Sequence, residues 1–503
     1  MLRKLNTLKQ FGNLNFTACA AYHSTRKIPD LTRDRYSVKR GDYGTLTNDD
    51  IKYFESILSN RCITDKNDIE MHNIDFYYSY RGSSQLLLKP KTTEEVSAIL
   101  KHCNSRKLAV CPQGGNTGLV AGTTPIFDEI IISMQLMNNI ERVDEASGVL
   151  VCQPGCVLEK LEEHVSQHNL VMPIDLGAKG TCHIGGNVST NAGGLRLLRY
   201  GNLHGNVLGI EAVKADGTIL DLMSNFKKDN TGYHLKHLFI GSEGTLGVIT
   251  KLAIACPPAS KAVNVALVGL NSFEDVLKTF TSAKRNLGEI MSACELMDHQ
   301  SLRFSVDHYK LNSPIGEYPF YLLLETSGSN LKHDEEKMNS FLESSLARGD
   351  IQDGVVTNET VKVRQIWAIR ELLPTAKINE KYFFKYDISV PLSRFYEIVP
   401  VMREHLGDSV CDVQGFGHIG DSNLHVHIIC DEFSDEIYKR IEPFIYEYTA
   451  KMKGSISAEH GIGFQKKELL KTFKQPEALH LMKELKSVMD PNHILNPYKV
   501  LCD

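Results

Sequence analysis

Long apolar runs, paired cysteines and a strong net charge are all missing from this chain of 503 residues. No stretch offers the roughly 18 uninterrupted apolar residues of a membrane-spanning helix, so the sequence predicts none. The 12 cysteines are scattered without a CxxC pair, which favours buried thiols over a disulfide framework or a zinc knuckle. A net charge of -5 gives no general attraction to nucleic acid. Small molecules or other proteins are the expected partners.

Acidic residues are absent from the first 29 positions, which carry five basic residues among Ser, Thr and Asn: Arg3, Lys4, Lys9, Arg26 and Lys27. This composition is typical of a mitochondrial presequence, and a disordered basic tail is the alternative. The sequence lacks the long apolar region of a secretory signal, so secretion is not expected. The final Leu-Cys-Asp is not the peroxisomal tripeptide. The sequence therefore predicts a presequence over residues 1–29 and a location in the mitochondrial matrix.

The length predicts two to four domains or sub-domains. After a lead-in of one or two helices over residues 30–84, the pattern alternates between strands and helices, with strands expected at 85–90, 107–111 and 130–133. Pro257-Pro258 marks a boundary. Strands and long charged helices fill a second domain, residues 261–455, and a helical segment, residues 456–503, is expected to return to the first domain, residues 85–260.

Glycine is concentrated in three segments of the first domain. The first is Pro112-Gln113-Gly114-Gly115-Asn116-Thr117-Gly118-Leu119, and the second spans residues 175–201. The third is Gly241-Ser242-Glu243-Gly244-Thr245-Leu246-Gly247-Val248-Ile249-Thr250, which runs into an expected strand. Without a Cβ, such loops let backbone N–H groups approach phosphate oxygens, although a tight structural turn is an alternative for the first. The second combines glycine with hydroxyl and amide side chains, which suits a backbone wrapped around an extended polar ligand.

In this order, the three segments resemble the FAD-binding domain of the vanillyl-alcohol oxidase superfamily, also known from p-cresol methylhydroxylase. The resemblance covers about residues 85–260 and implies an α+β chain, with a PCMH-type FAD-binding domain, an α+β substrate (cap) domain and a C-terminal helical segment. Several members tether the flavin through a histidine in the first loop, where this chain has Asn116, so non-covalent FAD is expected. The implied FAD contacts are Pro112, Gly114, Gly115, Asn116, Thr117, Gly118, Leu119, Gly177, Gly186, Asn187, Thr190, Asn191, Gly193, Gly194, Glu243, Gly244, Thr245, Gly247, Ile249 and Asn496.

Residues 415–420 read GFGHIG and so fit the GxGxxG pattern of NAD-binding proteins. That fingerprint must open a helix after a strand, whereas here a strand-like stretch at 424–428 follows. NAD binding is therefore not expected.

Three histidines, His418, His425 and His427, lie within ten residues, and Glu459-His460 follows 32 positions after the last of them. Residues two apart in a strand share a face, so His425 and His427 should point the same way, with His418 in the preceding glycine turn. Two histidines and a carboxylate with an open position are a catalytic metal arrangement. A group of unrelated core and surface histidines is the alternative.

The sequences GFGHIGDSNLHVH, SAEHGIGFQKK and the final NPYK resemble the family of D-2-hydroxyglutarate and D-lactate dehydrogenases. The resemblance, from about residue 40 onward, implies that His418, His425 and Glu459 hold a metal. Zinc is favoured and Mn or Co would also fit. It makes His460 the catalytic base and implies FAD-dependent oxidation of D-2-hydroxyglutarate to 2-oxoglutarate.

Arg370 and Lys385 provide the positive charge that a dicarboxylate substrate needs, although ordinary surface charges would look the same in the sequence. The family resemblance adds Thr375, His427 and His460 to the substrate contacts. Two positions depart from the family: Pro374 stands where a hydroxyl is frequent, with Thr375 next, and His427 stands where Asn is frequent. His427 could donate to a carboxylate or become a fourth metal ligand, so the departures affect the substrate more than the reaction.

Two other functions remain open. One is D-lactate oxidation on the same fold, and the other is binding of flavin or metal without catalysis, with His427 saturating the metal. The family suggests electron-transfer flavoprotein as the electron acceptor, while oxygen and cytochrome c are not excluded by the residues. The sequence does not fix the oligomeric state, and a homodimer is one option.

Overall fold

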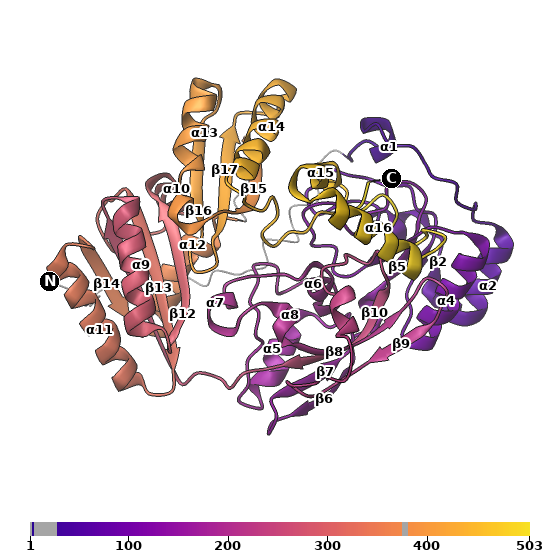
Figure 1. Ribbon diagram of the computed structural model, residues 1–503, viewed down its shortest axis with the longest axis horizontal. Coiled ribbons are helices and arrows are strands. Elements are labelled where there is room, and N and C mark those ends of the chain that lie inside the picture. Colours follow the sequence, from indigo (N-terminus) through magenta and orange to yellow (C-terminus); the bar gives the residue numbers. More distant parts are fainter. Residues whose placement is uncertain (1–2, 5–27, 375–380, 503) are drawn as a thin grey trace. The chain divides into compact units, whose positions relative to one another are not determined.

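The computed structural model describes residues 3–4, 28–374 and 381–502, which form two compact units (Figure 1). Unit 1 contains strand β1, residues Gly194–Gly201 and Ser260–Ala458. Unit 2 contains the other described residues: 28–193, Asn202–Ala259 and 459–502. Most of the expected presequence, as well as Thr375, lies outside the described residues. Among the described helices, none combines the length and the apolar character that crossing a bilayer requires.

Unit 1 is built on one sheet of eight strands in the order β1-β14-β11-β13-β12-β16-β17-β15. All neighbouring strands except the parallel β1–β14 pair are antiparallel. The strands are β1 (Arg3–Lys4), β11 (Ala262–Leu270), β12 (Met291–Asp298), β13 (Phe320–Gly328), β14 (Asp353–Thr357), β15 (Tyr382–Ser389), β16 (Asp412–His418) and β17 (Asn423–Cys430). The helices are α7 (Leu197–Tyr200), α9 (Phe273–Leu287), α10 (His299–Tyr309), α11 (Leu331–Arg348), α12 (Thr360–Glu371), α13 (Ile398–Leu406) and α14 (Asp435–Lys451), with short 3-10 turns at Leu392–Arg394 and Gly407–Ser409.

Helices cover both faces of this sheet. On one face, α9 and α11 pack side by side, and α13 lies over Gly415 of β16, where an added Cβ would meet Val399 (Figure 1). On the other face, which we call the α12 face, Phe416 packs in one core with Trp367 of α12 and Leu302 of α10. Because neighbouring residues of a strand point to opposite faces, the α12 face receives every second residue of β16 and β17.

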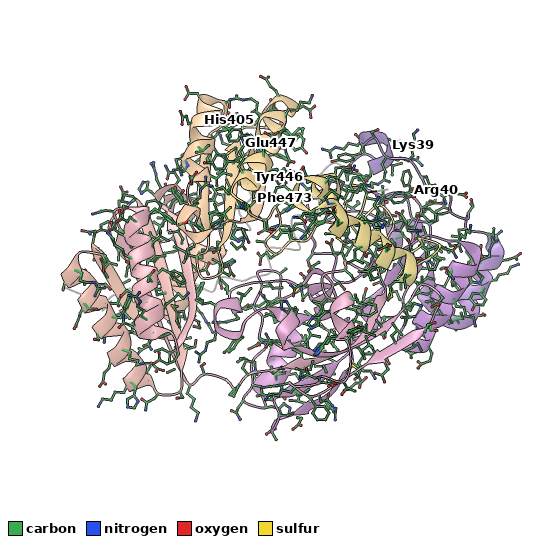
Figure 2. All side chains as sticks on the ribbon, viewed as in Figure 1. Lys39, Arg40, His405, Tyr446, Glu447 and Phe473 are labelled. Atoms are coloured by element: carbon green, nitrogen blue, oxygen red, sulfur yellow. The ribbon has the colours of Figure 1, made fainter. Side chains whose placement is uncertain are left out.

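Local signals in the sequence explain how the helices of unit 1 begin and end. The side chain of Asn330 accepts hydrogen bonds from the backbone N–H groups that start α11, and Gly349, with φ of 80°, ends it in the left-handed conformation. The ring of His405 in α13 stacks on the ring of Phe444 in α14, with centroids 4.0 Å apart, and this contact joins the two helices. Figure 2 labels His405 on α13 and Glu447 on α14. These helices hold the sheet from the face opposite to α12.

Unit 2 contains a five-stranded antiparallel sheet in the order β6-β7-β10-β8-β9 and a four-stranded sheet in the order β2-β3-β5-β4. The strands are β2 (Cys62–Ile63), β3 (Leu87–Leu88), β4 (Val110–Gln113), β5 (Ile130–Ser133), β6 (Ile140–Asp144), β7 (Val149–Cys152), β8 (Val207–Val213), β9 (Ile219–Leu222) and β10 (Val248–Ala255). The helices are α1 (Thr32–Arg35), α2 (Asn48–Leu58), α3 (Lys66–Glu70), α4 (Thr93–Arg106), α5 (Leu158–Ser166), α6 (Ile184–Thr190), α8 (Leu203–Asn206), α15 (Leu470–Phe473) and α16 (Pro476–Met489), with 3-10 turns at Ser59–Arg61, Met134–Leu136, Leu235–Leu238 and Lys467–Leu469.

The structure corrects three expectations about local structure. Among the described residues from 28 onward, three helices rather than one or two precede β3. The segment after residue 456 is helical only in part, because the glycine-rich residues 461–463 adopt turns. His418 is the last residue of strand β16 instead of part of a turn, because its pairing with Asn423 of β17 extends the hairpin to that point. The turn is thereby confined to residues 419–422.

We expect Asp50→Asn to lower the free energy of unfolding of unit 2 by about 1–2 kcal/mol at about pH 7, the usual range for a lost helix cap. Asp50 completes a capping box with Thr47 at the start of α2 and also bonds His102 and Arg106. Burial opposes its ionisation, but these hydrogen bonds hold the pKa of Asp50 well below its usual range.

Because the folded-state pKa is depressed, the stabilisation is complete above the unfolded-state value of about 3.9 and is lost as the pH falls below it. Urea unfolding across this range should show the difference between the parent and Asp50→Asn shrinking in acid. Asp49→Asn is the control, because Asp49 is an exposed acidic residue in the same helical turn. A difference that does not change with pH would contradict the assignment.

Candidate active site

The three clustered histidines lie on the α12 face of the unit 1 sheet. His425 and His427 alternate along β17, and His418 ends the neighbouring β16. All three are buried, and the rings of His418 and His425 are 5.3 Å apart between centroids at an interplanar angle of 81°. His427 packs its ring edge-to-face with Phe416, 4.7 Å between centroids, and His425 lies 5.4 Å from the same ring. The structure therefore brings His418 and His425 together and directs His427 toward an aromatic neighbour.

Each of the two adjacent histidines has a carboxylate directly opposite on the next strand. Glu295 of β12 pairs with His418 in the sheet register, and its Oε1 lies 2.8 Å from His418 Nδ1. Asp387 of β15 pairs with His425, with Oδ1 3.9 Å from Nδ1. Both carboxylates are 1% exposed. A carboxylate hydrogen-bonded to one ring nitrogen, as Glu295 is to His418, fixes the tautomer and leaves the other nitrogen for a metal. Asp387 adds a negative charge near His425, so these residues fit a divalent cation.

Neither Glu295 nor Asp387 was among the sequence-derived candidates. Glu295 lies 123 positions before His418 and Asp387 lies 38 positions before His425, so no spacing motif links them. The only local signal is a carboxylate inside an apolar strand: β12 reads MSACELMD and is buried throughout. Since a buried carboxylate needs a partner, Glu295 could have been singled out on that ground.

The two cations expected to bind substrate also lie in unit 1. Arg370 of α12 is 2% exposed and stacks its guanidinium over Phe416, 4.9 Å from the ring centroid. Its Nη2 lies 2.9 Å from Glu295 Oε2. Lys385 of β15 lies opposite His427 in the register and donates from Nζ to the carbonyl of Pro374, at 2.7 Å. Both charges are therefore on the α12 face, next to the histidines.

Glu459 and His460 open the last segment of unit 2, one peptide bond after Ala458, the final residue of unit 1. Their side chains are close, with Glu459 Oε1 3.9 Å from His460 Nε2. The following residues are fixed within unit 2 by Glu243, whose carboxylate accepts hydrogen bonds from the N–H groups of Ile462 and Gly463 at 2.7 and 2.8 Å. The two buried polar contacts hold the backbone that carries His460.

The first glycine segment and residues 175–193 of the second lie in unit 2, whereas Gly194 and the rest of the second segment belong to unit 1. A Cβ on Gly114 would be 3.7 Å from the Cα of Gly186, whereas one on Gly186, Gly118 or Gly177 would point into open space. Asn116 has φ of 52°, and its amide donates to the Ile74 carbonyl and accepts from Thr123, so it shapes the loop. The open positions around Gly186 form the kind of cradle that a phosphate-bearing ligand needs.

The third segment reaches the same strand end, because a Cβ on Gly244 would be 3.5 Å from Pro112. Asn496 ties it in place by donating to the carbonyls of Gly122 and Glu243 at 2.9 and 2.8 Å. Two predicted contacts also have contacts within the fold: Gly247 lies tightly against Phe239, and burial raises the pKa of Glu243 while its carboxylate accepts hydrogen bonds from the backbone. Their assignment as FAD contacts stays a prediction.

Two buried polar atoms beside the cradle support a bound ligand. Asn187 Oδ1 and His183 Nδ1 have no hydrogen-bond partner among the described residues, although buried polar groups are normally paired. Burial also lowers the pKa of His183, which favours the neutral ring. The cradle, these atoms and the left-handed Asn191 at the end of α6 fit the pyrophosphate-bearing ligand expected for this unit. His183 is a candidate contact that the sequence pattern did not reveal.

Gly186→Val is expected to abolish FAD retention while leaving unit 2 folded. Its Cβ would project into open space, with no other protein atom within 4 Å, and the side chain would occupy the space expected for the ligand. Gly205→Val is the matched control, since it is also a helical glycine with open space around its Cβ position. The flavin absorbance of the purified variants and their circular dichroism measure the two effects. If Gly186→Val retained as much FAD as the control, the flavin would not bind in this cradle.

Two family models match the chain: "FAD binding domain" over residues 84–223 and "FAD linked oxidases, C-terminal domain" over residues 259–500. The fold and the matches define the class of this protein, a flavin-dependent oxidoreductase with a FAD-binding domain of the PCMH type. The expected fold class and the expected FAD-dependent chemistry are therefore confirmed.

Curated relatives narrow the class further. The chain is 50% identical to mitochondrial D-2-hydroxyglutarate dehydrogenase of Rattus norvegicus, covering 96% of this chain and 91% of the relative. It is 45% identical to a Schizosaccharomyces pombe protein named as a mitochondrial D-lactate dehydrogenase, covering 97% and 98%. It is 42% identical to D-2-hydroxyglutarate–pyruvate transhydrogenase of Saccharomyces cerevisiae, covering 94% and 99%. The chain belongs to the D-2-hydroxyglutarate dehydrogenase family of FAD-linked oxidoreductases.

Solved structures agree on the fold. Alkyldihydroxyacetonephosphate synthase matches with a TM-score of 0.70 at 15% identity, covering 91% of this chain and 86% of that one. p-Cresol methylhydroxylase matches with a TM-score of 0.70 at 13% identity, covering 91% and 97%. At these identities the likeness concerns architecture alone.

Proposed function

We propose that the chain oxidises D-2-hydroxyglutarate to 2-oxoglutarate. The observation that carries the proposal is the α12 face of unit 1, where His418 and His425 lie together, each backed by a buried carboxylate, with the buried Arg370 beside them. Metal donors next to a guanidinium suit a 2-hydroxy acid, because the hydroxyl and the carboxylate of that substrate sit on adjacent carbons. The 50% identity to a named D-2-hydroxyglutarate dehydrogenase supports the same substrate.

Two bound groups would supply the chemistry. FAD, held without a covalent bond, would accept the two electrons, and a divalent metal would lower the pKa of the substrate hydroxyl. We propose that His418, His425 and Glu459 hold this metal, as the family resemblance implies, with Asp387 lying 3.9 Å from His425 within unit 1. Histidine and carboxylate donors favour zinc, and Mn or Co remain compatible.

The side chains of the protein then have separate tasks. His460 would take the proton of the substrate hydroxyl, since it adjoins the proposed ligand Glu459. Arg370 would bind the carboxylate next to C2, and Lys385 would bind the distal carboxylate as a point charge. His427 is buried, packs against Phe416 and lies opposite Lys385 on the neighbouring strand. It would donate a hydrogen bond to the substrate. These contacts would fix the C2 hydrogen for transfer.

Lys385→Met should lower kcat/KM for D-2-hydroxyglutarate by about 10- to 100-fold, the usual cost of one charge-assisted hydrogen bond, and leave D-lactate oxidation nearly unchanged. D-lactate has no second carboxylate for Lys385 to bind. Lys381→Met is the control, because Lys381 precedes the same strand and pairs with the exposed Asp431 instead. Steady-state rates with both substrates test the prediction. An equal loss for both substrates would argue against a role for Lys385 in selecting the dicarboxylate.

The direct test of the function is anaerobic bleaching of the flavin spectrum by D-2-hydroxyglutarate, with D-lactate and both L-enantiomers alongside. Bleaching by the D-dicarboxylate in preference to the others is expected. Bleaching by D-lactate alone would keep the reaction class and assign the substrate named for the Schizosaccharomyces pombe relative. No bleaching by any of the four acids, with FAD and metal present, would contradict the proposal.

We infer that the enzyme acts in mitochondria, because the relatives from Rattus norvegicus and Schizosaccharomyces pombe are named mitochondrial and the first 29 residues lack acidic side chains. Electron-transfer flavoprotein is our proposed acceptor. Stopped-flow reoxidation of the reduced enzyme by electron-transfer flavoprotein, cytochrome c, oxygen and pyruvate decides among acceptors. Pyruvate is included because the Saccharomyces cerevisiae relative is named a transhydrogenase. Fast reoxidation by pyruvate alone would replace the proposed acceptor.

A further inference from the structure

Glu295 has two neighbours that serve different parts of the proposed reaction. Its Oε1 lies 2.8 Å from Nδ1 of His418, a proposed metal ligand. Its Oε2 lies 2.9 Å from Nη2 of Arg370, the proposed carboxylate-binding residue. The glutamate side chain is 2% exposed and stands in the middle of the unit 1 sheet, on the fully buried strand β12. One buried carboxylate therefore touches both residues.

We propose that Glu295 is a positioning residue that sets both the tautomer of His418 and the orientation of the Arg370 guanidinium. This inference rests on the proposed function. Its first part follows from hydrogen-bond chemistry: a carboxylate beside Nδ1 keeps the proton on that nitrogen, so the lone pair of Nε2 is available to a metal. The negative charge also makes the imidazole a stronger ligand, an effect usually worth about 10- to 100-fold in metal affinity.

The second part of the proposal, the orientation of Arg370, follows from the hydrogen-bond donors that its guanidinium leaves unused. Although Nη2 is close to Glu295, neither Nε nor Nη2 has an acceptor in hydrogen-bond geometry among the described residues. A buried guanidinium with unused donors needs a further acceptor, and a substrate carboxylate can supply a bidentate one. Glu295 balances the buried charge and, together with the ring of Phe416, keeps the guanidinium fork facing one direction. Pre-set orientation lowers the cost of binding substrate.

A purely structural role for Glu295, holding α12 to the sheet, is a weaker explanation because another carboxylate already does this. Glu325 of β13 accepts a hydrogen bond at 2.8 Å from Nε1 of Trp367, one helical turn before Arg370 on α12. Glu325 is 3% exposed and also bonds Ser292 and Arg196. Its side-chain hydrogen bonds go to Trp367, Ser292, Arg196 and Ser327. Glu325 is therefore a matched control for Glu295.

The test compares Glu295→Gln and Glu325→Gln in the full-length, FAD-loaded protein. The first measurement is metal affinity, obtained by competition of Zn²⁺ with a chelator and from the visible spectrum of bound Co²⁺. We expect Glu295→Gln to weaken metal binding about 10- to 100-fold and to raise KM for D-2-hydroxyglutarate more than it lowers kcat. We expect Glu325→Gln to lower the thermal midpoint but to keep metal affinity within a few-fold of the parent. Equal metal affinity in the two variants would overturn the inference.

Two further variants keep the result interpretable. Should Glu295→Gln not fold, Glu295→Asp retains the buried charge, yet its shorter side chain cannot reach both partners, so either metal affinity or KM must change. Unchanged values for both would overturn the inference. His418→Ala separates the two proposals: if it retains Zn²⁺ with parental affinity, the proposed metal site itself is wrong. If His418→Ala loses Zn²⁺ while Glu295→Gln keeps it, only the role of Glu295 is refuted.

Discussion

His460→Ala is expected to lower kcat for D-2-hydroxyglutarate by about 10²- to 10⁴-fold, the usual contribution of a general base, while FAD stays bound. Alanine removes the only group that we propose to accept the hydroxyl proton. Flavin binding should survive because the cradle at Gly114 and Gly186 uses other segments of unit 2. The flavin spectrum and single-turnover bleaching measure the two properties separately.

His480→Ala is the control for this variant. His480 is an exposed histidine of α16, also in unit 2, and its Nε2 lies 3.4 Å from Glu484 of the next helical turn. It should bleach at the parental rate. Near-parental bleaching by His460→Ala would show that another group accepts the proton, and loss of flavin from His460→Ala would show that the residue serves the fold or the cofactor instead.

Loss of the metal should have the second large effect. His418→Ala and His425→Ala are each expected to release the metal and to lower kcat/KM by about 10³-fold or more, because the Lewis acid contributes several kcal/mol to stabilising the developing alkoxide. A chelator should produce the same loss in the parent protein. Adding Zn²⁺, Mn²⁺ or Co²⁺ back should restore the activity of the chelated parent, and the ion that restores the most activity identifies the functional metal. None of them should restore the activity of His418→Ala.

His427→Asn is the matched control for the metal variants. His427 shares strand and face with His425 but packs against Phe416, so metal content should stay at the parental level in this variant. Loss of metal from His427→Asn would make His427 a fourth ligand. If the flavin also stayed oxidised after addition of each of the four acids, the two results would favour a binding protein without catalysis, the alternative left open by the sequence.

Some features of the site could be predicted from the sequence because they depend on neighbouring residues. The shared face of His425 and His427 follows from the two-residue period of a strand, and β17 has this conformation. The glycines of the proposed flavin cradle could be singled out because a residue without Cβ allows the close approach of a ligand to the backbone. By contrast, His418 was expected in a turn, since its place at the end of β16 depends on pairing with Asn423.

Other features depend on strand register, which the local sequence does not encode. Glu295 opposes His418 and Asp387 opposes His425 only because β12, β16, β17 and β15 are adjacent in the sheet. The sequence by itself determined the family, the flavin segments and the identity of the histidines, because these are carried by contiguous motifs. Only the tertiary structure decided which carboxylates lie opposite those histidines and which one faces Arg370, because these residues are 38 to 123 positions apart in the sequence and are brought together by strand pairing and by the packing of α12 on the sheet.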